Sequence, residues 1–158
     1  MQIMQEPLAN PLLSASKKYL NALSKMVNQL SIDRYHYVLV LIDFHNENLS
    51  QKALAEILHI DKSYMVNILD YLEEKDYILR EKNPYDRREQ LIRLTAKAQL
   101  DIPVIKEAIE ELNNRSLQNI SESKKLILNE VLSIIQDNLI KIESKEIKKP
   151  HTILKNYN

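Results

Sequence analysis

The sequence predicts a mainly helical protein with one small β-hairpin. Apolar residues recur at helical spacing over most of the 158 residues. Two short segments, 77–80 and 90–94, read instead as strands, and the turn residues Asn83-Pro84-Tyr85-Asp86 separate them. The chain has no glycine, so its turns must be made by Asn, Asp, Lys, Ser or Pro, some of them at positive φ.

Composition excludes several classes of protein. Without cysteine there is no disulfide framework, cysteine-based zinc site or thiol redox sensor. Without glycine, the phosphate-cradling loops of Rossmann and P-loop nucleotide-binding proteins cannot form. The longest apolar run, 37–42, is too short to cross a bilayer, and the N-terminus does not read as a signal peptide. We therefore expect a single domain over 1–158, in the cytoplasm and without a membrane partner.

Charge is balanced overall but unevenly distributed. The chain has 22 Lys and Arg against 22 Asp and Glu. Residues 75–97 hold seven basic and four acidic side chains, whereas 101–123 hold two basic and five acidic ones. The basic excess coincides with the predicted hairpin and favours an acidic partner there; chance patterning of a solvated surface is the alternative.

The N-terminal part is expected to form two helices. The first begins at Asn10-Pro11, where Asn caps the helix and proline takes the first helical position. Residues 31–33 interrupt the apolar pattern. A second helix then carries apolar side chains at 37, 38, 41 and 42, and it ends at the polar residues 46–48.

Two short helices joined by a tight turn follow. Ser50 caps the first and Asp61 caps the second, with His59-Ile60 as the break between them. The side chains expected to face inward from the first helix are Leu54, Ile57 and Leu58. The second has one apolar stripe, formed by Met65, Ile68, Leu69 and Leu72. The two helices and the hairpin that follows them in the sequence form a winged helix-turn-helix over 49–95, whose second helix would be the recognition helix.

The C-terminal part is also predicted to be helical. Thr95 caps a helix that Pro103 should kink or restart, with Asp101 as the new cap. The stripe of this helix is Ile105, Ala108, Ile109 and Leu112. Ser121 starts the last helix, which Pro150 ends. Its apolar residues alternate in steps of four and three, at Leu128, Leu132, Ile135, Leu139 and Ile142. We expect 10–46 and 96–147 to form a dimerisation region; burial within one chain is the alternative.

The segment 49–98 carries an ordered set of short motifs. They are Leu49-Ser50-Gln51 with Leu54-Ala55, Lys62-Ser63, Asp70 with Leu72-Glu73, Asp86-Arg87-Arg88, and Leu94-Thr95. In this order they resemble the MarR family of bacterial transcriptional regulators. The family usually has glycine at the position of Asp76, and Asp tolerates the left-handed conformation that such a turn requires.

The resemblance implies a homodimer with intertwined terminal helices and two winged-helix lobes. These lobes would straddle a pseudo-palindromic site on double-stranded DNA. Proteins of this family usually repress transcription and release DNA when a small, often phenolic or acidic, molecule binds near the dimer interface. We expect a repressor of this kind; a winged-helix protein-interaction module without specific DNA binding is the alternative.

The recognition helix and the wing are the expected DNA contacts. Lys62 and Ser63 lie at a helix N-terminus, which favours phosphate. Asn67 suits an adenine edge, and Tyr64 suits a thymine methyl or a phosphate, unless it packs on the wing. The strongest single candidate is Arg88, which we expect in the minor groove. The full predicted set is Gln51, Lys62, Ser63, Tyr64, Asn67, Arg80, Lys82, Arg87 and Arg88. Asp86 should pair with an arginine and support the wing.

Aromatic side chains on the first two helices suggest an effector pocket in the family's arrangement. They are Tyr19, Tyr35, His36, Tyr37 and Phe44; packing in the core or interface is the alternative. His36 and His45 have no further ligands at convincing spacing, so we expect neither a metal nor a cofactor. No Ser/His/Asp or paired-carboxylate set points to an enzyme.

Overall fold

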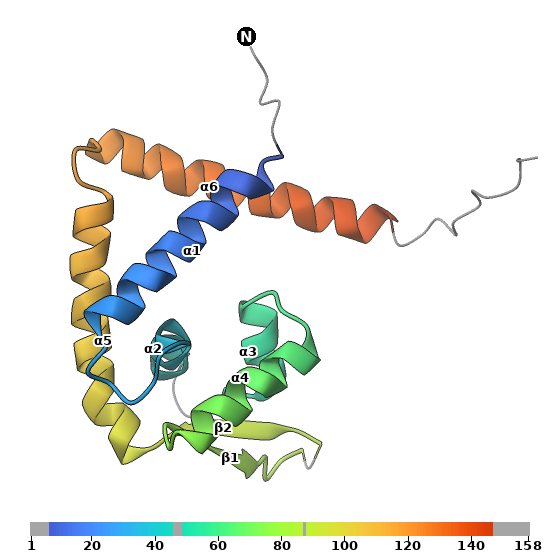
Figure 1. Ribbon diagram of the computed structural model, residues 1–158. Coiled ribbons are helices and arrows are strands. Elements are labelled where there is room, and N and C mark those ends of the chain that lie inside the picture. Colours follow the sequence, from blue (N-terminus) through green and yellow to red (C-terminus); the bar gives the residue numbers. More distant parts are fainter. Residues whose placement is uncertain (1–6, 46–48, 87, 147–158) are drawn as a thin grey trace, which may run out of the picture. The chain divides into compact units, whose positions relative to one another are not determined.

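The computed structural model describes residues 7–45, 49–86 and 88–146 (Figure 1). Arg87 and the segments 46–48 and 147–158, on which some expectations rested, lie outside these residues. The chain divides into two compact units, Met1–Ser116 and Leu117–Asn158. The elements of the first unit, in chain order, are α1 (Ala9–Met26), α2 (His36–His45), α3 (Gln51–Ile57), α4 (Lys62–Glu74), β1 (Ile78–Lys82), β2 (Gln90–Leu94) and α5 (Ala96–Ser116). The second unit contains α6 (Glu122–Glu146).

The first helix begins earlier than predicted. α1 starts at Ala9, and Leu8 precedes it without any side-chain cap. The amide of Asn10 donates to the carbonyl of Pro7 at 3.0 Å, so the predicted Asn10 cap is wrong. Pro11 still lies in the first turn, where a missing N–H removes no intrahelical hydrogen bond. Proline therefore marked the start of the helix but did not determine which residue is the cap.

The predicted caps of the helix-turn-helix are confirmed. The Ser50 hydroxyl accepts from the amide of Ala53 at 3.1 Å, and the Asp61 carboxylate accepts from the amide of Tyr64 at 2.8 Å. The stripe of α4 is fully buried, as the spacing predicted, at Met65, Ile68, Leu69 and Leu72. On α3, Leu54 is buried, but Ile57 is 37% exposed. The inward prediction for Ile57 is wrong because this last helical residue lies at the edge of the buried face.

The hairpin is anchored to the helix-turn-helix at both ends. β1 and β2 pair antiparallel, with Ile78 opposite Leu94 and Lys82 opposite Gln90. At the start of α3, Ser50 forms a β-bridge with Leu91. Between α4 and β1, Asp76 adopts the predicted left-handed turn at φ 61°. The wing is therefore fixed to α3 on one side and to the recognition helix on the other.

Left-handed backbone in this glycine-free chain is not confined to typical turn residues. Asp76 and Asn119 agree with the expectation, but Tyr35 (φ 64°) and His59 (φ 50°) do not. His59 follows the last turn of α3, where its amide donates to the carbonyl of Glu56 at 3.2 Å. A left-handed residue closes a helix in this way, and glycine is the residue usually found there. The fold therefore imposes these conformations on residues that do not favour them.

α5 is continuous through Pro103, so the predicted restart with Asp101 as a new cap is wrong, and the alternative of a kink stays a prediction. The Asp101 carboxylate instead accepts a hydrogen bond from the Tyr77 hydroxyl at 2.6 Å. Ile102 and Ile105 on either side of the proline are buried. Proline costs one helical hydrogen bond, and the burial of these neighbours keeps the helix intact. The predicted Thr95 cap is confirmed by the amide of Ala98, 3.2 Å from the Thr95 hydroxyl.

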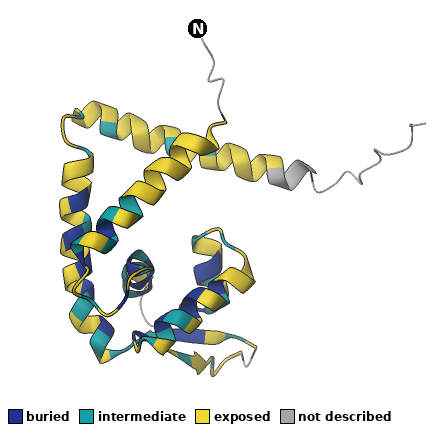
Figure 2. Cartoon of the chain, viewed as in Figure 1, coloured by how far each residue is buried: buried dark blue, intermediate teal, exposed yellow. Residues whose placement is uncertain are grey.

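One main core fills the first unit, between α2, α3, α4, the hairpin and the first half of α5 (Figure 2). A smaller cluster joins α1 to the second half of α5 through Leu23, Val27, Ala108 and Leu112. α2 contacts both α5 and β2 inside this unit (Figure 1). Together these contacts hold α3, α4 and the hairpin in one rigid arrangement.

The left-handed residue after α3 gives a test of backbone strain. His59→Gly should stabilise the protein by about 0.5–1 kcal/mol, because glycine accepts positive φ without steric cost. The midpoint of thermal unfolding should rise by about 2–4 °C. His59→Ala is the matched control, since it removes the exposed ring but keeps the strain. Equal midpoints for the two variants would contradict this account.

Candidate nucleic-acid interface

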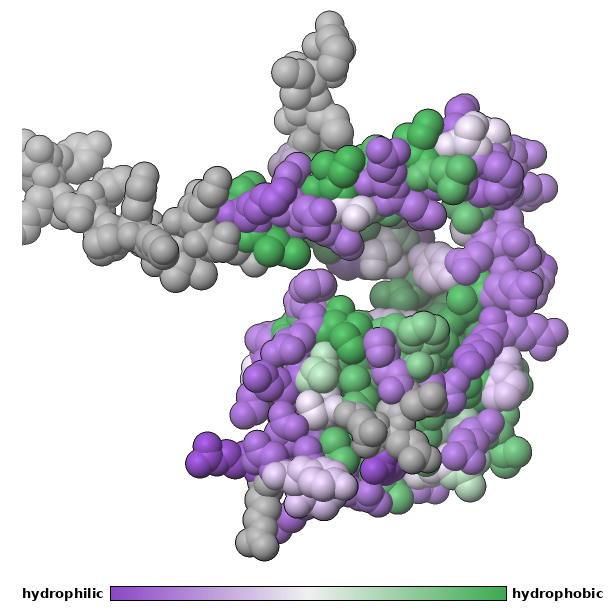
Figure 3. Space-filling model, turned by 180° about the vertical axis from the view of Figure 1, so that it is seen from behind, coloured by the Kyte–Doolittle hydropathy of each residue, from purple (hydrophilic) through white to green (hydrophobic). Residues whose placement is uncertain are grey.

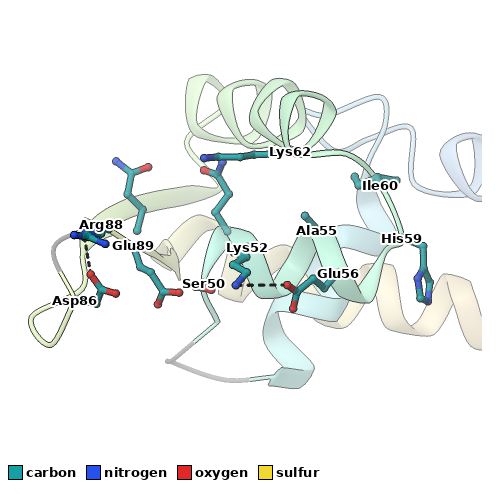
Figure 4. Close-up of a pocket in the computed structure, with 12 residues that line it drawn as sticks. Ser50, Lys52, Ala55, Glu56, His59, Ile60, Lys62, Asp86, Arg88 and Glu89 are labelled. Atoms are coloured by element: carbon teal, nitrogen blue, oxygen red, sulfur yellow. Dashed lines mark hydrogen bonds and ion pairs between the residues drawn. The ribbon is translucent and has the colours of Figure 1, made fainter. Parts of the chain in front are cut away.

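A groove of about 810 Å³ lies between α3, the start of α4 and the tip of the hairpin (Figure 4). Its wall is formed by Ser50, Gln51, Lys52, Ala55, Glu56, His59, Ile60, Lys62, Asp86, Arg88, Glu89 and Gln90. Three predicted DNA contacts, Gln51, Lys62 and Arg88, therefore line one hollow although they come from three elements. Lys82, Ser63 and Asn67 are exposed outside it.

The hairpin tip is held by side chains that bond to the backbone. The Asp86 carboxylate accepts from the amide of Arg88 at 2.9 Å, and Asn83 accepts from the amide of Tyr85 at 2.9 Å. The carbonyl of Asp86 accepts from the amide of Glu89 at 3.0 Å. Asp86 therefore supports the wing through a backbone amide, and its pairing with an arginine stays a prediction because Arg87 lies outside the described residues. This geometry leaves the Arg88 side chain exposed at the end of the groove (Figure 4).

The N-terminus of α4 combines a cap with a cationic side chain. Lys62, Ser63 and Asn67 are all exposed. The Ser63 hydroxyl donates to the Asp61 carboxylate at 2.5 Å, and this bond, with the amide of Tyr64, lowers the pKa of Asp61. Asp61 therefore stays charged and occupies part of the positive helix end. The exposed cation at this end is Lys62, which faces the groove.

Arg80 is part of an ion-pair network and does not face solvent as a phosphate contact. Its side chain is only 18% exposed, and a guanidinium nitrogen lies 2.7 Å from the Asp70 carboxylate. Its Nε also donates to Glu73 at 2.9 Å, and its amide donates to the same carboxylate at 3.1 Å. These bonds lower the pKa of Glu73. Arg80 therefore ties β1 to the recognition helix, and its guanidinium is not free for the predicted phosphate contact.

Tyr64 lies on the side of α4 that meets α2, away from the wing. It is 46% exposed and lines a pocket of about 210 Å³ together with Tyr35, His36 and Tyr37. α1 contributes Leu20, Asn21, Leu23 and Ser24, and the connection between α1 and α2 contributes Asp33 and Arg34. A side-chain hydrogen bond with Tyr64, added to burial, raises the pKa of Tyr35. Three of the five predicted pocket residues are therefore brought together.

The other two predicted pocket residues lie elsewhere. The Tyr19 hydroxyl donates to Asn113 at 2.7 Å, linking α1 to α5. Phe44 is 77% exposed and meets the ring of His45 edge-on. His36 is buried, with its Nε2 3.1 Å from the carbonyl of Ile32, and burial lowers its pKa. This imidazole is therefore neutral near pH 7.

Sequence reasoning missed a second polar contact of the recognition helix. The Tyr71 hydroxyl donates to Asp33 at 2.6 Å, and the guanidinium carbon of Arg34 lies 4.5 Å from the centre of the Tyr71 ring. The only sequence signal is that Tyr64 and Tyr71 are seven residues apart, which places them on one helix face. Their partners on the α1–α2 connection could not be inferred from spacing.

The described residues contain neither a metal-ligating cluster nor a membrane-spanning helix. In the described ranges, no group of three or more His, Cys, Asp or Glu side chains could hold a metal ion. Among those same residues, no helix is long and apolar enough to span a bilayer.

Similarity to known proteins agrees with this geometry. Residues 32–90 match the family model of the MarR family. The chain is 29% identical over 106 residues to the uncharacterized HTH-type transcriptional regulator YdgJ of Bacillus subtilis (strain 168). That alignment covers 67% of this chain and 65% of YdgJ, slightly less than two thirds of the relative.

Two solved structures extend the similarity over most of the chain. The transcriptional regulator PA3341 has a TM-score of 0.73 at 25% identity, covering 85% of this chain and 99% of that one. The transcriptional repressor CouR, bound to a 23-mer DNA duplex, has a TM-score of 0.71 at 22% identity, covering 86% and 99%. The fold and the groove thus define a winged helix-turn-helix protein. Over the helix-turn-helix and the wing, the chain is similar to the MarR family.

Burial of His36 gives a test by pH. The unfolded chain binds a proton on this imidazole below its usual pKa of 6.5, and the folded protein resists it. The free energy of unfolding should therefore fall as the pH decreases below 6.5, by at most about 1.4 kcal/mol per pH unit. His36→Gln removes the titrating group, so its stability should depend less on pH. Denaturant titrations of both proteins between about pH 8 and about pH 5 measure the difference; parallel curves would contradict the prediction.

Proposed function

We propose that this protein is a DNA-binding transcriptional regulator, most simply a repressor, that acts as a homodimer. The observation that carries the proposal is the groove in which Gln51, Lys62 and Arg88 converge from α3, α4 and the hairpin. The match of residues 32–90 to the MarR family model supports the same function, and the structurally similar CouR is a repressor bound to DNA.

In this proposal α4 enters the major groove and the hairpin reaches the adjacent minor groove. The buried stripe of α4 leaves Ser63 and Asn67 on its exposed side, where Asn67 can bond an adenine edge. Arg88 lies at the wing end of the groove (Figure 4). The negative potential of a narrow minor groove favours such an arginine. One phosphate strand would then pass between α4 and the wing, beside Lys62.

The wing arginine gives a quantitative test. Arg88→Ala should weaken DNA binding for all sequences and reduce the slope of log affinity against log salt by about one unit. Fluorescence anisotropy across a salt series, with DNA from upstream of the protein's own gene, measures both. Arg115→Ala is the control, because this exposed arginine at the end of α5 pairs with Glu111 far along the chain from the wing. A wild-type slope for Arg88→Ala would contradict the proposed contact.

The surface of α6 supports the dimer. This 25-residue helix has no buried side chain among 122–142, and green apolar side chains are visible among the purple ones in Figure 3. The predicted seam is exposed or half-buried at Leu128, Leu132, Ile135, Leu139 and Ile142. Ile127, Val131 and Ile134 are exposed as well and widen it on one side. An arc of this width is expected to contact more than one neighbouring helix, which a partner chain supplies.

Charge placed in the seam should separate the dimer. Leu132→Glu buries an unpaired carboxylate if the seam is an interface, which costs several kcal/mol. Ser133→Glu is the matched control, because the next residue is exposed and points away from the seam. Light scattering after size exclusion should give a monomer for Leu132→Glu and a dimer for Ser133→Glu. A dimer of unchanged stability in both would contradict this role of α6.

The pocket beside α4 supports release of DNA by a small aromatic or acidic effector. Its phenol rings suit an aromatic ligand, and the exposed Arg34 suits a carboxylate. The competing function is a winged-helix protein-interaction module. The groove wall carries as many carboxylates as cations, but Lys52 pairs with Glu56. The exposed Lys62 and Arg88 are the side chains that suit DNA phosphate. If the folded dimer binds no DNA from its own upstream region above the non-specific level, the interaction module is the better account.

A further inference from the structure

Residues 33–35, at the end of the connection between α1 and α2, are tied to the recognition helix mainly through Tyr71. The Tyr71 hydroxyl donates to the Asp33 carboxylate at 2.6 Å, and the Asp33 amide donates to the Tyr71 oxygen at 3.2 Å. Arg34 lies over the Tyr71 ring at 4.5 Å, and Tyr35 meets it edge-on at 5.6 Å. All three residues of this segment therefore contact Tyr71 of α4.

The same three residues line the pocket proposed for an effector. Asp33, Arg34 and Tyr35 form part of its wall, opposite Asn21 and Ser24 of α1. Tyr64 lines it from α4, seven residues before Tyr71 and so on the same helix face. A molecule that enters this pocket must therefore touch the segment that holds the recognition helix.

The backbone of this connection is strained. Tyr35 has φ 64°, a conformation that costs a non-glycine residue free energy and persists only where neighbouring contacts enforce it. Those contacts are the ring of Tyr71 and the cation of Arg34, 5.5 Å from the Tyr35 ring. A change in the pocket that relieves this strain would also loosen the contacts to α4. Coupling requires a second arrangement of this segment, and the strain at Tyr35 favours one.

We propose that residues 33–35 and Tyr71 transmit the occupancy of the pocket to the recognition helix. Tyr71 is then a positioning residue and makes no contact with DNA. The proposal rests on the proposed function, because it explains how the effector pocket changes DNA affinity. A ligand could compete for the Asp33 carboxylate, or it could separate residues 33–35 from α1. Either ligand would act by weakening the hydrogen bond between Tyr71 and Asp33.

A double-mutant cycle on DNA affinity tests the coupling. Tyr71→Phe and Asp33→Ala each remove the same hydrogen bond, and each should weaken binding roughly 2- to 10-fold. The double variant should bind no more weakly than the weaker single variant, because one bond is lost in all three. Asp33→Asn keeps an acceptor oxygen and should restore binding to within about 2-fold of the wild type.

The control for the cycle is Tyr19→Phe. It removes a comparable hydrogen bond, 2.7 Å long, between α1 and α5, and it should leave DNA affinity unchanged. Thermal unfolding of every variant separates a structural effect from coupling. A lower midpoint with wild-type affinity in Tyr71→Phe and Asp33→Ala would overturn the proposal, and so would additive losses in the cycle.

Ser24→Trp tests the pocket without a ligand. Ser24 is half-buried in the pocket wall, so the indole should fill the space and mimic occupancy. We expect affinity for DNA to fall roughly 2- to 30-fold and the loss to disappear when Tyr71→Phe is also present. The same loss in both backgrounds, or no loss in either, would overturn the proposal.

The experiment separates this inference from the proposed function. If the wild-type dimer binds no DNA, the proposed function fails and the coupling fails with it. If the wild type binds and the cycle is additive, only the coupling fails. The chain has no tryptophan, so Ser24→Trp also reports through its fluorescence whether the indole is shielded from water, as filling of the pocket requires.

Discussion

The burial of one face of α4 is the constraint on which the rest of this structure depends. Met65, Ile68, Leu69 and Leu72 are completely buried, and each such side chain contributes about 1.5–3 kcal/mol to stability. Because this stripe must face the core, the opposite face with Asn67 must face solvent. The two edges of the helix then meet different neighbours, the wing on one side and the α1–α2 connection on the other. The burial of one face of α4 therefore determines which of its residues contact the wing, the α1–α2 connection or solvent.

Polar anchors fix each neighbour of α4. On the wing side, Arg80 bonds to Asp70 and Glu73 and holds β1 against the helix. On the other side, Tyr71 bonds to Asp33. Directly before β1, the fully buried Tyr77 donates to Asp101 and lies 3.2 Å from the Ser31 hydroxyl, so it joins the start of this strand to α5 and to the connection between α1 and α2. Buried or half-buried polar groups of this kind specify geometry, because each is costly to leave unpaired.

The lack of glycine shapes the connections between these elements. Tyr35, His59 and Asp76 all take positive φ; Tyr35 lies directly before α2, and His59 and Asp76 lie just beyond the ends of α3 and α4. Side chains at these positions bring contacts that glycine could not make. Tyr35 meets the ring of Tyr71 edge-on, and His59 lines the groove. Two of these strained residues therefore line a candidate site: His59 lines the groove and Tyr35 lines the pocket.

Local patterns predicted much of the fold because they act within one element. The caps at Ser50, Asp61 and Thr95, the stripe of α4, both strands and the left-handed Asp76 all depend on a few neighbouring residues. Where the prediction failed, a distant residue decided the outcome. Asp101 is no cap because Tyr77 takes its carboxylate, and Arg80 is no phosphate contact because Asp70 and Glu73 surround it.

The candidate DNA interface was likewise predictable in part from local patterns and decided in part by tertiary packing. The sequence by itself determined the winged helix-turn-helix and most of the side chains that its outer surface carries, because helical and strand periods assign each residue to a face. Only the tertiary structure decided which of them meet. It brought Gln51, Lys62 and Arg88 to one groove and turned Tyr64 toward Tyr35. The reason is that distances between elements depend on how their buried faces pack, and spacing along the chain does not encode them.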